Sequence, residues 1–412
     1  MGSEMCIRDR DNMKYGLFKY ETENIGDEIQ SIAARRFLPS VDAYIDRDRL
    51  GEYCPDEETK IITNGWFMHA PYQWPPKSGK VIPLTVSMYI DQADSKVLDT
   101  FFSDTSIKYL NDHGPVGARD LSTLELLQKH GVESYFSGCM TLTLQRDPSI
   151  PKGDFVLAVD VPQSVVEMVQ SHTGRSVIHA SPYFDANMSQ DDRFQLAEYF
   201  LYLYQSAAAV ISTRLHAMLP ALALETPVFL VKDRSKYDEK RYAGLAELVN
   251  SATDEEYLND YSLFDVDAPK KNPESYLKIR ERLIEKAANF TGFDSDSSFR
   301  TVDFSHIADN ESYIRLFTRG FHSLNRELLL EGDKKWLQEQ CDDLRRIRQH
   351  LDEELQDAQK KQNDLSLQND ILRKRIEVME NRIEVMEKSS SWRIGRTITA
   401  PGRKLKNMIR GN

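Results

Sequence analysis

The sequence predicts an α/β fold with two parallel sheets, followed by a C-terminal α-helical coiled coil. Short apolar runs alternate with amphipathic helical patterns in two separate series, and the polar stretch 145–153 divides them. Strands that alternate with helices are typical of parallel sheets that helices cover on both faces. Near the C-terminus, apolar residues recur every seven positions, which is the pattern of a coiled coil.

Composition excludes several classes of protein. The chain has 412 residues and a formal net charge of −12, from 53 Lys and Arg against 65 Asp and Glu. This acidic total argues against general nucleic-acid binding, and no stretch approaches the roughly 20 apolar residues that cross a bilayer. The four cysteines are scattered without a Cys-x-x-Cys pair, so we expect neither a disulfide framework nor a structural zinc site. Together with the absence of a secretory signal pattern, this indicates a reducing, cytoplasmic location.

The first series predicts an N-terminal α/β domain over residues 13–150. Residues 1–12 have no hydrophobic period and are expected to be a non-native leader. The expected strands are Lys14–Phe18, Lys60–Thr63, Val81–Val86 and Ser134–Phe136. The expected helices are Glu28–Phe37, Ser95–Phe102 and Leu121–His130.

The second series predicts a C-terminal α/β domain over residues 151–290, with a loop over Asp254–Asn272. The expected strands are Phe155–Val159, Ser176–Ala180, Ala208–Ile211 and Val228–Val231. The expected helices are Gln163–Gln170, Asp191–Ser206, Leu215–Leu224, Lys236–Asn250 and a closing helix, Glu274–Phe290. Ligands of open α/β sheets bind beyond the carboxyl ends of the strands, so we expect the site in the cleft between the two domains.

The C-terminal part is expected to contain a linker and helix over 291–330 and a coiled coil over 331–388. The d positions of the seven-residue repeat are Leu344, Leu351, Ala358, Leu365, Leu372, Met379 and Met386. The a positions are Cys341, Arg348, Leu355, Gln362, Asn369, Ile376 and Ile383. A polar Asn at position a fixes the register and favours two strands, so we expect a parallel homodimer. A single solvated helix is the alternative, because three a positions are polar.

The last segment, 389–412, is a basic tail without an acidic residue. With Lys388, its cations are Arg393, Arg396, Arg403, Lys404, Lys406 and Arg410, and apolar residues are interleaved among them. Such a segment can lie on an anionic membrane surface, and a disordered basic tail is the alternative. Nucleic acid is a poorer partner, since no basic fold surface accompanies the tail.

One strand-to-helix turn is the most informative segment for chemistry. An apolar strand runs into Ser212 and Thr213, which are good N-cap residues, and then into a helix. Arg214 and His216 are expected in its first turn, where free N–H groups and the positive helix end attract anions. A guanidinium can grip phosphate or carboxylate, and a histidine can transfer protons near neutral pH. The alternative is that Arg214 forms an ion pair and that His216 is a buried core residue.

Arg119 is a parallel feature in the first domain. It stands just before an expected helix, where it could hold an anion. The alternative is an ion pair with Asp120 or Glu125.

Asn24, Gly26 and Asp27 join the first expected strand to the first expected helix. Gly26 permits a close backbone approach, and Asp27 is expected to cap the helix, with ligand contact as a second possibility.

Other site types find less support in the sequence. The chain has no G-x-x-x-x-G-K-[ST] motif for a nucleoside triphosphatase, no G-x-G-x-x-G motif for a dinucleotide and no G-x-S-x-G elbow for a hydrolase. The spacings of His69, His113, His172 and His179 to carboxylates and thiols match no metal site. We therefore expect no metal.

These segments resemble those of the polysaccharide pyruvyl transferase family. The resemblance runs from Tyr15 to about Asn250 and is most specific at Ile211-Ser212-Thr213-Arg214-Leu215-His216-Ala217 followed by Pro227. It also includes N-x-G-D-E at Asn24–Glu28 and Gly117-Ala118-Arg119-Asp120-x-Ser122. The stretches 64–69 and 137–143 depart from the family's usual pattern, which leaves the acceptor sugar open. The tail segment Ser391-Trp392-Arg393-Ile394 resembles one that follows coiled coils in bacterial glycosyltransferases.

The resemblance implies two Rossmann-like domains (GT-B-like) and transfer of the pyruvyl group of phosphoenolpyruvate onto sugar hydroxyls. The products would be a pyruvate ketal on a surface polysaccharide or exopolysaccharide and free phosphate. It implies that Arg214 and Leu215 contact the donor, that Arg119 is a second anion-binding arginine and that His216 donates the proton. No cofactor is implied beyond phosphoenolpyruvate as donor substrate, and the acceptor would be a saccharide or lipid-linked oligosaccharide, met in the cytoplasm or at the inner membrane face. The rival hypotheses are a GT-B glycosyltransferase that uses a nucleotide sugar, and a non-catalytic coiled-coil scaffold with a degenerate transferase head.

Overall fold

The computed structural model describes residues 13–67, 73–184 and 188–292, single residues between 302 and 317, and residues 355–391, 393–395 and 397–398. The chain divides into two compact units, Met1–Glu327 and Leu328–Asn412. The expected leader, most of the 291–330 segment, the first part of the expected coiled coil and most of the basic tail therefore lie outside the described residues.

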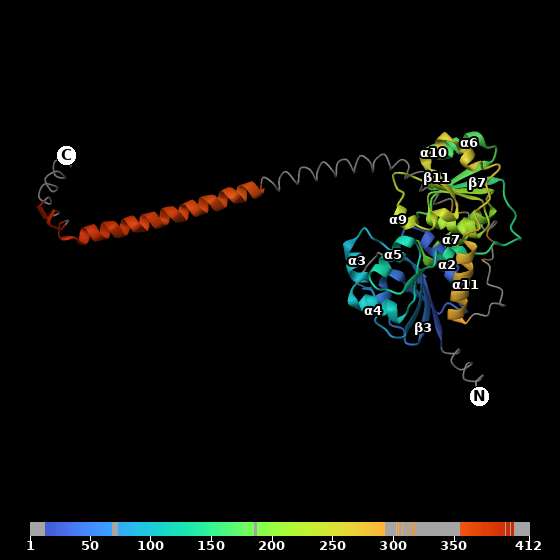
Figure 1. The fold of residues 1–412 in the computed structure, drawn as a ribbon, viewed down its shortest axis with the longest axis horizontal. Helices are drawn as coiled ribbons and strands as arrows, with labels where there is room; N and C mark the ends of the chain where they lie inside the picture. The colour runs from blue at the N-terminus through green and yellow to red at the C-terminus, as the bar shows by residue number, and fades with distance from the viewer. Residues whose placement is uncertain are drawn as a thin grey trace, which may run out of the picture. The chain divides into compact units, whose positions relative to one another are not determined.

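The first unit contains two parallel sheets, which confirms the predicted α/β class (Figure 1). The first sheet has the strand order β2-β1-β3-β4-β5-β6. Its strands are β1 (Lys14–Lys19), β2 (Ala43–Asp46), β3 (Thr59–Phe67), β4 (Val81–Ile90), β5 (Val116–Ala118) and β6 (Ser134–Phe136). Its helical segments are α2 (Gly26–Arg35), η1 (Arg47–Glu52), α3 (Ser95–Phe101), α4 (Asp104–Asp112), α5 (Leu121–Lys129) and η3 (Met140–Thr143).

The second sheet has the order β11-β10-β9-β7-β8. Its strands are β7 (Phe155–Val159), β8 (Ser176–Ala180), β9 (Ala209–Ser212), β10 (Val228–Lys232) and β11 (Asn250–Thr253). The helical segments are α6 (Gln163–His172), α7 (Gln190–Ser206), α8 (Leu215–Ala223), α9 (Glu239–Tyr242), η4 (Ala246–Leu248), α10 (Asp254–Asn259), η5 (Tyr261–Phe264) and α11 (Leu277–Thr291). β7, β9 and β10 are nearly continuous apolar runs, as strands covered on both faces require.

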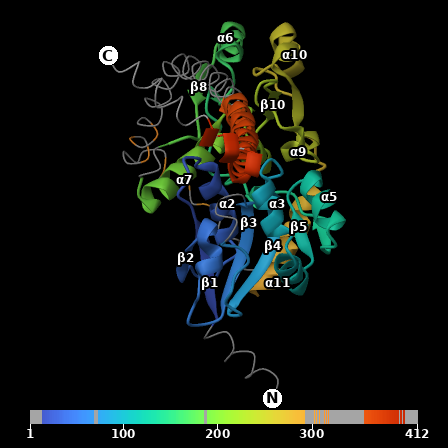
Figure 2. The same ribbon diagram turned by 90° about the vertical axis from the view of Figure 1, so that its left-hand side faces the viewer.

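The two halves share one hydrophobic core. A single buried cluster contains Leu17 and Ile29 from the first half and Leu157 and Leu196 from the second. α2 lies against α7 and α8, and the views in Figures 1 and 2 place it between the sheets. Because α2 is covered on all sides, even Glu28, Gln30 and Ser31 are buried.

The helix α11 returns to the first half. Lys60 Nζ of β3 donates a hydrogen bond to the Phe290 carbonyl at 2.7 Å, and the Lys286 ammonium lies 4.5 Å from the ring centre of Tyr135. The sequence predicted that this helix closes the second half. In the structure it also packs on β3 and β6 of the first half.

Several predicted elements were wrong. The expected helix Lys236–Asn250 is interrupted by Gly244, whose φ is +80°, and it yields α9, η4 and the start of β11. The expected loop Asp254–Asn272 begins with α10, which Thr253 and Glu256 stabilise with a capping box. The strands β2 and β5 and the helix α4 were not predicted.

The second unit contains a described helix over 355–388, within the predicted coiled-coil segment. Its apolar side chains are exposed, so the structure establishes a helix there and leaves its pairing as a prediction. No helix among the described residues is both long enough and apolar enough to span a bilayer.

Candidate functional site

A pocket of about 220 Å³ lies between the two sheets, at the carboxyl ends of their strands. This is where the α/β pattern predicted a ligand site. The first half contributes Trp66, Tyr89, Asp91 and Ala93. The second half contributes Thr213, Arg214, Val231, Asp233, Lys236, Tyr237, Asp238, Arg241 and Tyr242.

Arg214 lines this pocket from the N-cap position of α8. Ser212 and Thr213 are not the cap: the Ser212 hydroxyl instead accepts from the Arg214 amide at 2.8 Å. The Arg214 guanidinium bonds Asp160 and donates to the Tyr183 hydroxyl at 3.1 Å. The ion pair named as the alternative for Arg214 is therefore present, while donor contact stays a prediction. The Asp160 carboxylate raises the pKa of Arg214 against the lowering effect of burial.

His216 is the second residue of α8 and is only 7% exposed. Its Nε2 has no hydrogen-bond partner among the described residues. Burial lowers the pKa of His216 well below its usual range, and the positive charges of Arg119, Arg241 and Arg47 lower it further. The imidazole is therefore neutral at pH 7.

Gly26 brings the first half of the chain against His216. A Cβ at this position would lie 2.9 Å from His216 Cβ and 3.0 Å from both His216 Nδ1 and Asn24 Oδ1. The Asn24 side chain accepts from the Gly26 amide at 3.0 Å, and Asn24 forms an isolated bridge with Tyr183 of the second half. The Asn24–Gly26 turn therefore connects the halves next to the imidazole.

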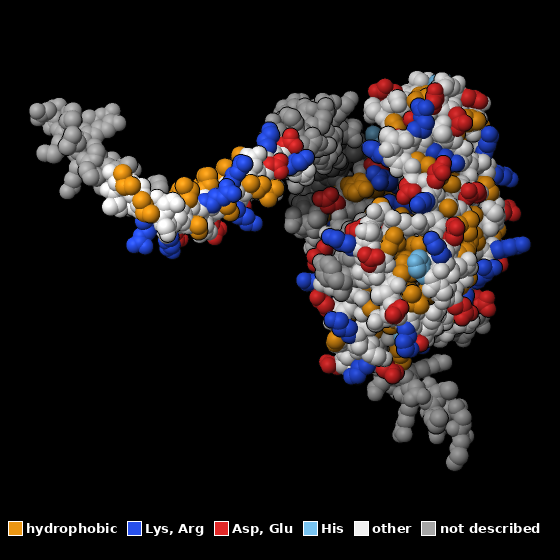
Figure 3. Space-filling model, turned by 60° about the vertical axis from the view of Figure 1, so that its left-hand side comes forward, with side chains coloured by type: hydrophobic (Ala, Val, Ile, Leu, Met, Phe, Trp, Pro, Cys, Tyr) orange, Lys and Arg blue, Asp and Glu red, His pale blue; other side chains and the backbone are white. Residues whose placement is uncertain are grey.

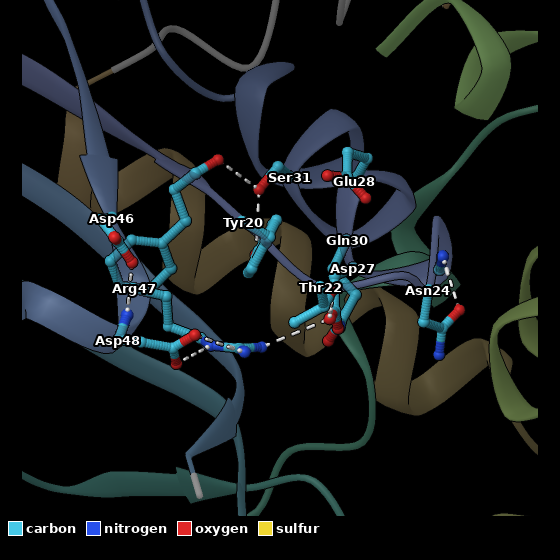
Figure 4. Close-up of polar contacts among 12 residues, drawn as sticks. Tyr20, Thr22, Asn24, Asp27, Glu28, Gln30, Ser31, Asp46, Arg47 and Asp48 are labelled. Atoms are coloured by element: carbon cyan, nitrogen blue, oxygen red, sulfur yellow. Dashed lines mark hydrogen bonds and ion pairs between the residues drawn. The ribbon is translucent and has the colours of Figure 1, made fainter. Parts of the chain in front are cut away.

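Asp27 does not cap α2, contrary to the prediction, because the helix begins one residue earlier, at Gly26. Its buried carboxylate accepts from the Thr22 hydroxyl at 3.0 Å and from Gln30 Nε2 at 3.3 Å. It also lies 3.6 Å from Arg47 Nη1 (Figure 4). Its role in the structure is to hold Arg47, whose charge acts on His216.

Arg119 is fully buried beside the pocket. Its guanidinium lies 4.1 Å from the ring centre of Tyr89, and its Nε is 3.5 Å from the Asp120 carboxylate. None of its three guanidinium nitrogens has a hydrogen-bond partner among the described residues. Burial lowers the pKa of Arg119, and the Asp120 charge opposes that shift. A buried guanidinium with unsatisfied donors is suited to receive an anion.

Sequence reasoning missed Arg241 and the aromatic residues of the pocket wall. The Arg241 guanidinium stacks over Trp66 at 4.7 Å, and its Nε lacks a hydrogen-bond partner within the described part of the chain. The Tyr242 hydroxyl donates to the Thr213 carbonyl at 2.7 Å. Burial raises the pKa of Tyr242, and the positive charges of Arg241 and Arg214 oppose that rise. Tyr89 lies three residues beyond the predicted strand Val81–Val86 and was missed because β4 continues to Ile90. Arg241 gave no signal, because it lay inside a wrongly predicted helix.

The structure thus brings together the predicted residues Arg119, Arg214, Leu215 and His216. Gly26 lies against the imidazole, Asn24 belongs to the same turn, and Asp27 lies beside Arg47. Of these, Arg214 lines the pocket directly. The arrangement offers several guanidinium groups and one buried imidazole to an anionic ligand. No group of three or more His, Cys, Asp or Glu among the described residues is placed to hold a metal ion.

Comparisons with solved structures give low similarity. A functionally uncharacterized protein from Klebsiella pneumoniae is 14% identical, with a TM-score of 0.36, over 58% of this chain and 91% of that one. The wall teichoic acid polymerase TagF gives 12% identity and a TM-score of 0.34, over 77% of this chain and 91% of that one. The E. coli heptosyltransferase WaaC is 11% identical, with a TM-score of 0.28, over 67% of this chain and 99% of that one. These TM-scores are too low to establish a shared fold.

No protein of curated function matches the sequence. The family model of polysaccharide pyruvyl transferases matches residues 24–233, which include Asn24, Arg119, Arg214 and His216. Since this match covers half of the chain, the protein belongs to the polysaccharide pyruvyl transferase family.

Proposed function

We propose that this protein transfers the pyruvyl group of phosphoenolpyruvate onto two hydroxyls of one sugar in a surface polysaccharide or exopolysaccharide. The products are a cyclic pyruvate ketal and phosphate. The observation that carries the proposal is the set of arginines around one buried histidine, with Arg119 lacking hydrogen-bond partners among the described residues. Phosphoenolpyruvate carries a carboxylate and a phosphate, which match guanidinium groups in charge and geometry.

Donor binding charges the proton donor, which takes its proton from solvent. Burial lowers the pKa of His216 well below its usual range, and it is lowered further by the positive charges of the surrounding arginines. The negative charges of the donor offset them, so His216 takes up a proton when phosphoenolpyruvate binds. The proton then moves from His216 to the methylene carbon, and the electron pair of the carbon–carbon double bond forms the new C–H bond. A positioned acid contributes about 10²–10⁴-fold to such a step.

The remaining steps form the ketal. Protonation leaves an oxocarbenium-like carbon that bears the phosphate, and the first sugar hydroxyl adds to it and releases its proton. Asp91 lines the pocket and is the carboxylate proposed to accept that proton. The carbon–oxygen bond to phosphate then breaks, phosphate leaves with the electron pair, and the second hydroxyl adds and loses its proton to the departing phosphate.

The decisive experiment measures phosphate release as a function of both phosphoenolpyruvate and defined saccharides. His216→Ala should abolish turnover while circular dichroism and the melting temperature stay near those of the wild type. Retained turnover in this variant would remove His216 from the mechanism. Tight binding of a nucleotide sugar without binding of phosphoenolpyruvate would favour a glycosyltransferase instead.

The proposal extends to partners and location. The chain acts as a homodimer through segment 331–388, on a saccharide or lipid-linked oligosaccharide acceptor in the cytoplasm. The cations of segment 389–412 bind the anionic inner face of the membrane. The support for these statements is the seven-residue repeat and the charge of the tail.

A further inference from the structure

The helix over 355–388 carries an uncovered apolar stripe. At d positions, Leu365, Leu372, Met379 and Met386 are 53–60% exposed, and at a positions Ile376 and Ile383 are 51% and 57% exposed. Figure 3 shows hydrophobic side chains together with cations and anions along the described helix. An exposed apolar stripe of this length is typical of a surface that another helix covers.

Charged residues flank the stripe in a regular order. The two g positions nearest the C-terminus hold Arg375 and Arg382, here called the g arginines. The e positions that follow them hold Glu380 and Glu387, here called the e glutamates. Each arginine is five residues from its glutamate, whereas pairs within one helix form at spacings of three or four. Within the described helix, Lys388 pairs with Glu384, and none of these four residues takes part in an ion pair.

These charges distinguish the two possible orientations of a second helix. In a parallel pair, each g residue faces the e residue five positions later in the other chain, so every g arginine meets an e glutamate. In an antiparallel pair, g faces g and e faces e, which mostly sets arginine against arginine and glutamate against glutamate. Like charges at these positions destabilise the pair. The parallel orientation is therefore favoured.

The register is also specified. The heptads 375–381 and 382–388 are nearly identical, so a slip by one heptad is the natural competitor. In register, Asn369 faces its own copy and the two amides can hydrogen-bond each other. After a slip by one heptad, Asn369 of one chain faces Ile376, the next residue at position a, in the other chain. One g arginine then faces Arg373, which is at an e position. Both changes are unfavourable, because a buried amide is left unpaired and two like charges meet.

We propose that two copies of this chain pair through helix 355–388 as a parallel, in-register coiled coil whose orientation is set by the g arginines and e glutamates. This inference rests on the homodimer proposed above and is independent of the donor chemistry. It brings the C-terminal ends of the two helices together, so that the two basic tails start from neighbouring positions.

The test uses the full chain in sedimentation equilibrium over a range of concentrations. One double variant, Arg375→Glu with Arg382→Glu, makes all facing e and g charges negative. The other, Glu380→Arg with Glu387→Arg, makes them all positive. Each alone should raise the dimer dissociation constant on the order of a hundredfold, and an equimolar mixture should regain wild-type affinity as a heterodimer.

Matched controls change the same charges on the outer face. Lys360→Glu with Lys374→Glu, and Asp370→Arg with Glu377→Arg, lie at f and b positions and should leave the dissociation constant within about threefold of wild type. Circular dichroism checks that helix content is unchanged.

Orientation is tested by oxidation of single-cysteine additions. Leu372→Cys at a d position should cross-link to its own copy, and Ile371→Cys on the outer face should not exceed the wild-type background. A monomer at all concentrations, a trimer or tetramer, a lack of cross-linking at position 372, or no rescue in the mixture would overturn the proposal.

Discussion

Gly26→Ala is the sharpest test of how the two halves assemble the site. The added Cβ would lie 2.9 Å from His216 Cβ and 3.0 Å from His216 Nδ1, whereas ordinary contacts are 3.4–4 Å. Gly26 does not have a positive φ, so the backbone accepts alanine and the whole cost is steric. To restore normal contact, the imidazole or the turn that holds Asn24 must move by about half an ångström.

Two effects of opposite sign set the magnitude. Alanine in a helix stabilises by about 0.5–1 kcal/mol relative to glycine. Overpacking of a tight contact costs about 1–3 kcal/mol. We therefore expect a net loss of about 0–2.5 kcal/mol in the free energy of unfolding. The effect on turnover is larger in relative terms, since displacing a reacting group by about 1 Å can cost 10²-fold. We expect kcat to fall by about 10- to 100-fold.

The assay combines phosphoenolpyruvate-dependent phosphate release with urea unfolding. Gly174→Ala is the matched control, because a Cβ there meets nothing within 4 Å. It should keep wild-type kcat and lose no stability. If Gly26→Ala behaves like Gly174→Ala in both measurements, the close approach of Gly26 to His216 does not position the imidazole, and the reasoning is refuted.

Three further predictions follow from the same geometry. Because the pKa of folded His216 is well below the unfolded value of about 6.5, the unfolded chain binds more protons and the protein loses stability as the pH falls below that value. In urea unfolding, the stability of the wild type relative to His216→Gln should thus shrink between pH 7 and pH 5, and a constant difference would contradict the low pKa. Arg241 lines the pocket, and no described carboxylate pairs with it, so its guanidinium is available to the anionic donor. Arg241→Gln should therefore raise the KM for phosphoenolpyruvate about 10-fold. The control is Arg175→Gln, outside the pocket, which should leave this KM unchanged. Arg193→Ala should lower the free energy of unfolding by about 3–5 kcal/mol, because it leaves the buried Glu28 carboxylate without its cation. In the wild type, this carboxylate lies 2.5 Å from Arg193 Nε. The control is Arg35→Ala, which should cost under about 1 kcal/mol because the ion pair of Arg35 with Glu198 is partly exposed.

Elements with strong local patterns were predicted well. The strands β6, β7 and β8 have the predicted bounds, and α8 differs by one residue at its end. Their apolar runs are bounded by turn residues, so local sequence is enough to find them. The strands β2 and β5 are four and three residues long and were missed, because Ala43, Asp46, Gly117 and Ala118 are residue types that strands disfavour. The strand β6 is equally short, but its aromatic residues Tyr135 and Phe136 are typical of a strand. The Lys236–Asn250 prediction failed because the backbone conformation at Gly244 outweighed the helical period.

By itself, the sequence determined the α/β class, the two series of strands and helices, the heptad repeat and the segments that resemble the family. These are properties of local patterns and motifs along the chain. Only the tertiary structure decided which charges surround His216, since Arg47, Arg119 and Arg241 come from elements far apart in the chain. It also decided that Arg214 is paired with Asp160 and that Asp27 holds Arg47 instead of capping a helix. A pKa and an ion pair depend on distances across the fold, and those distances arise only when the two halves pack on a shared core.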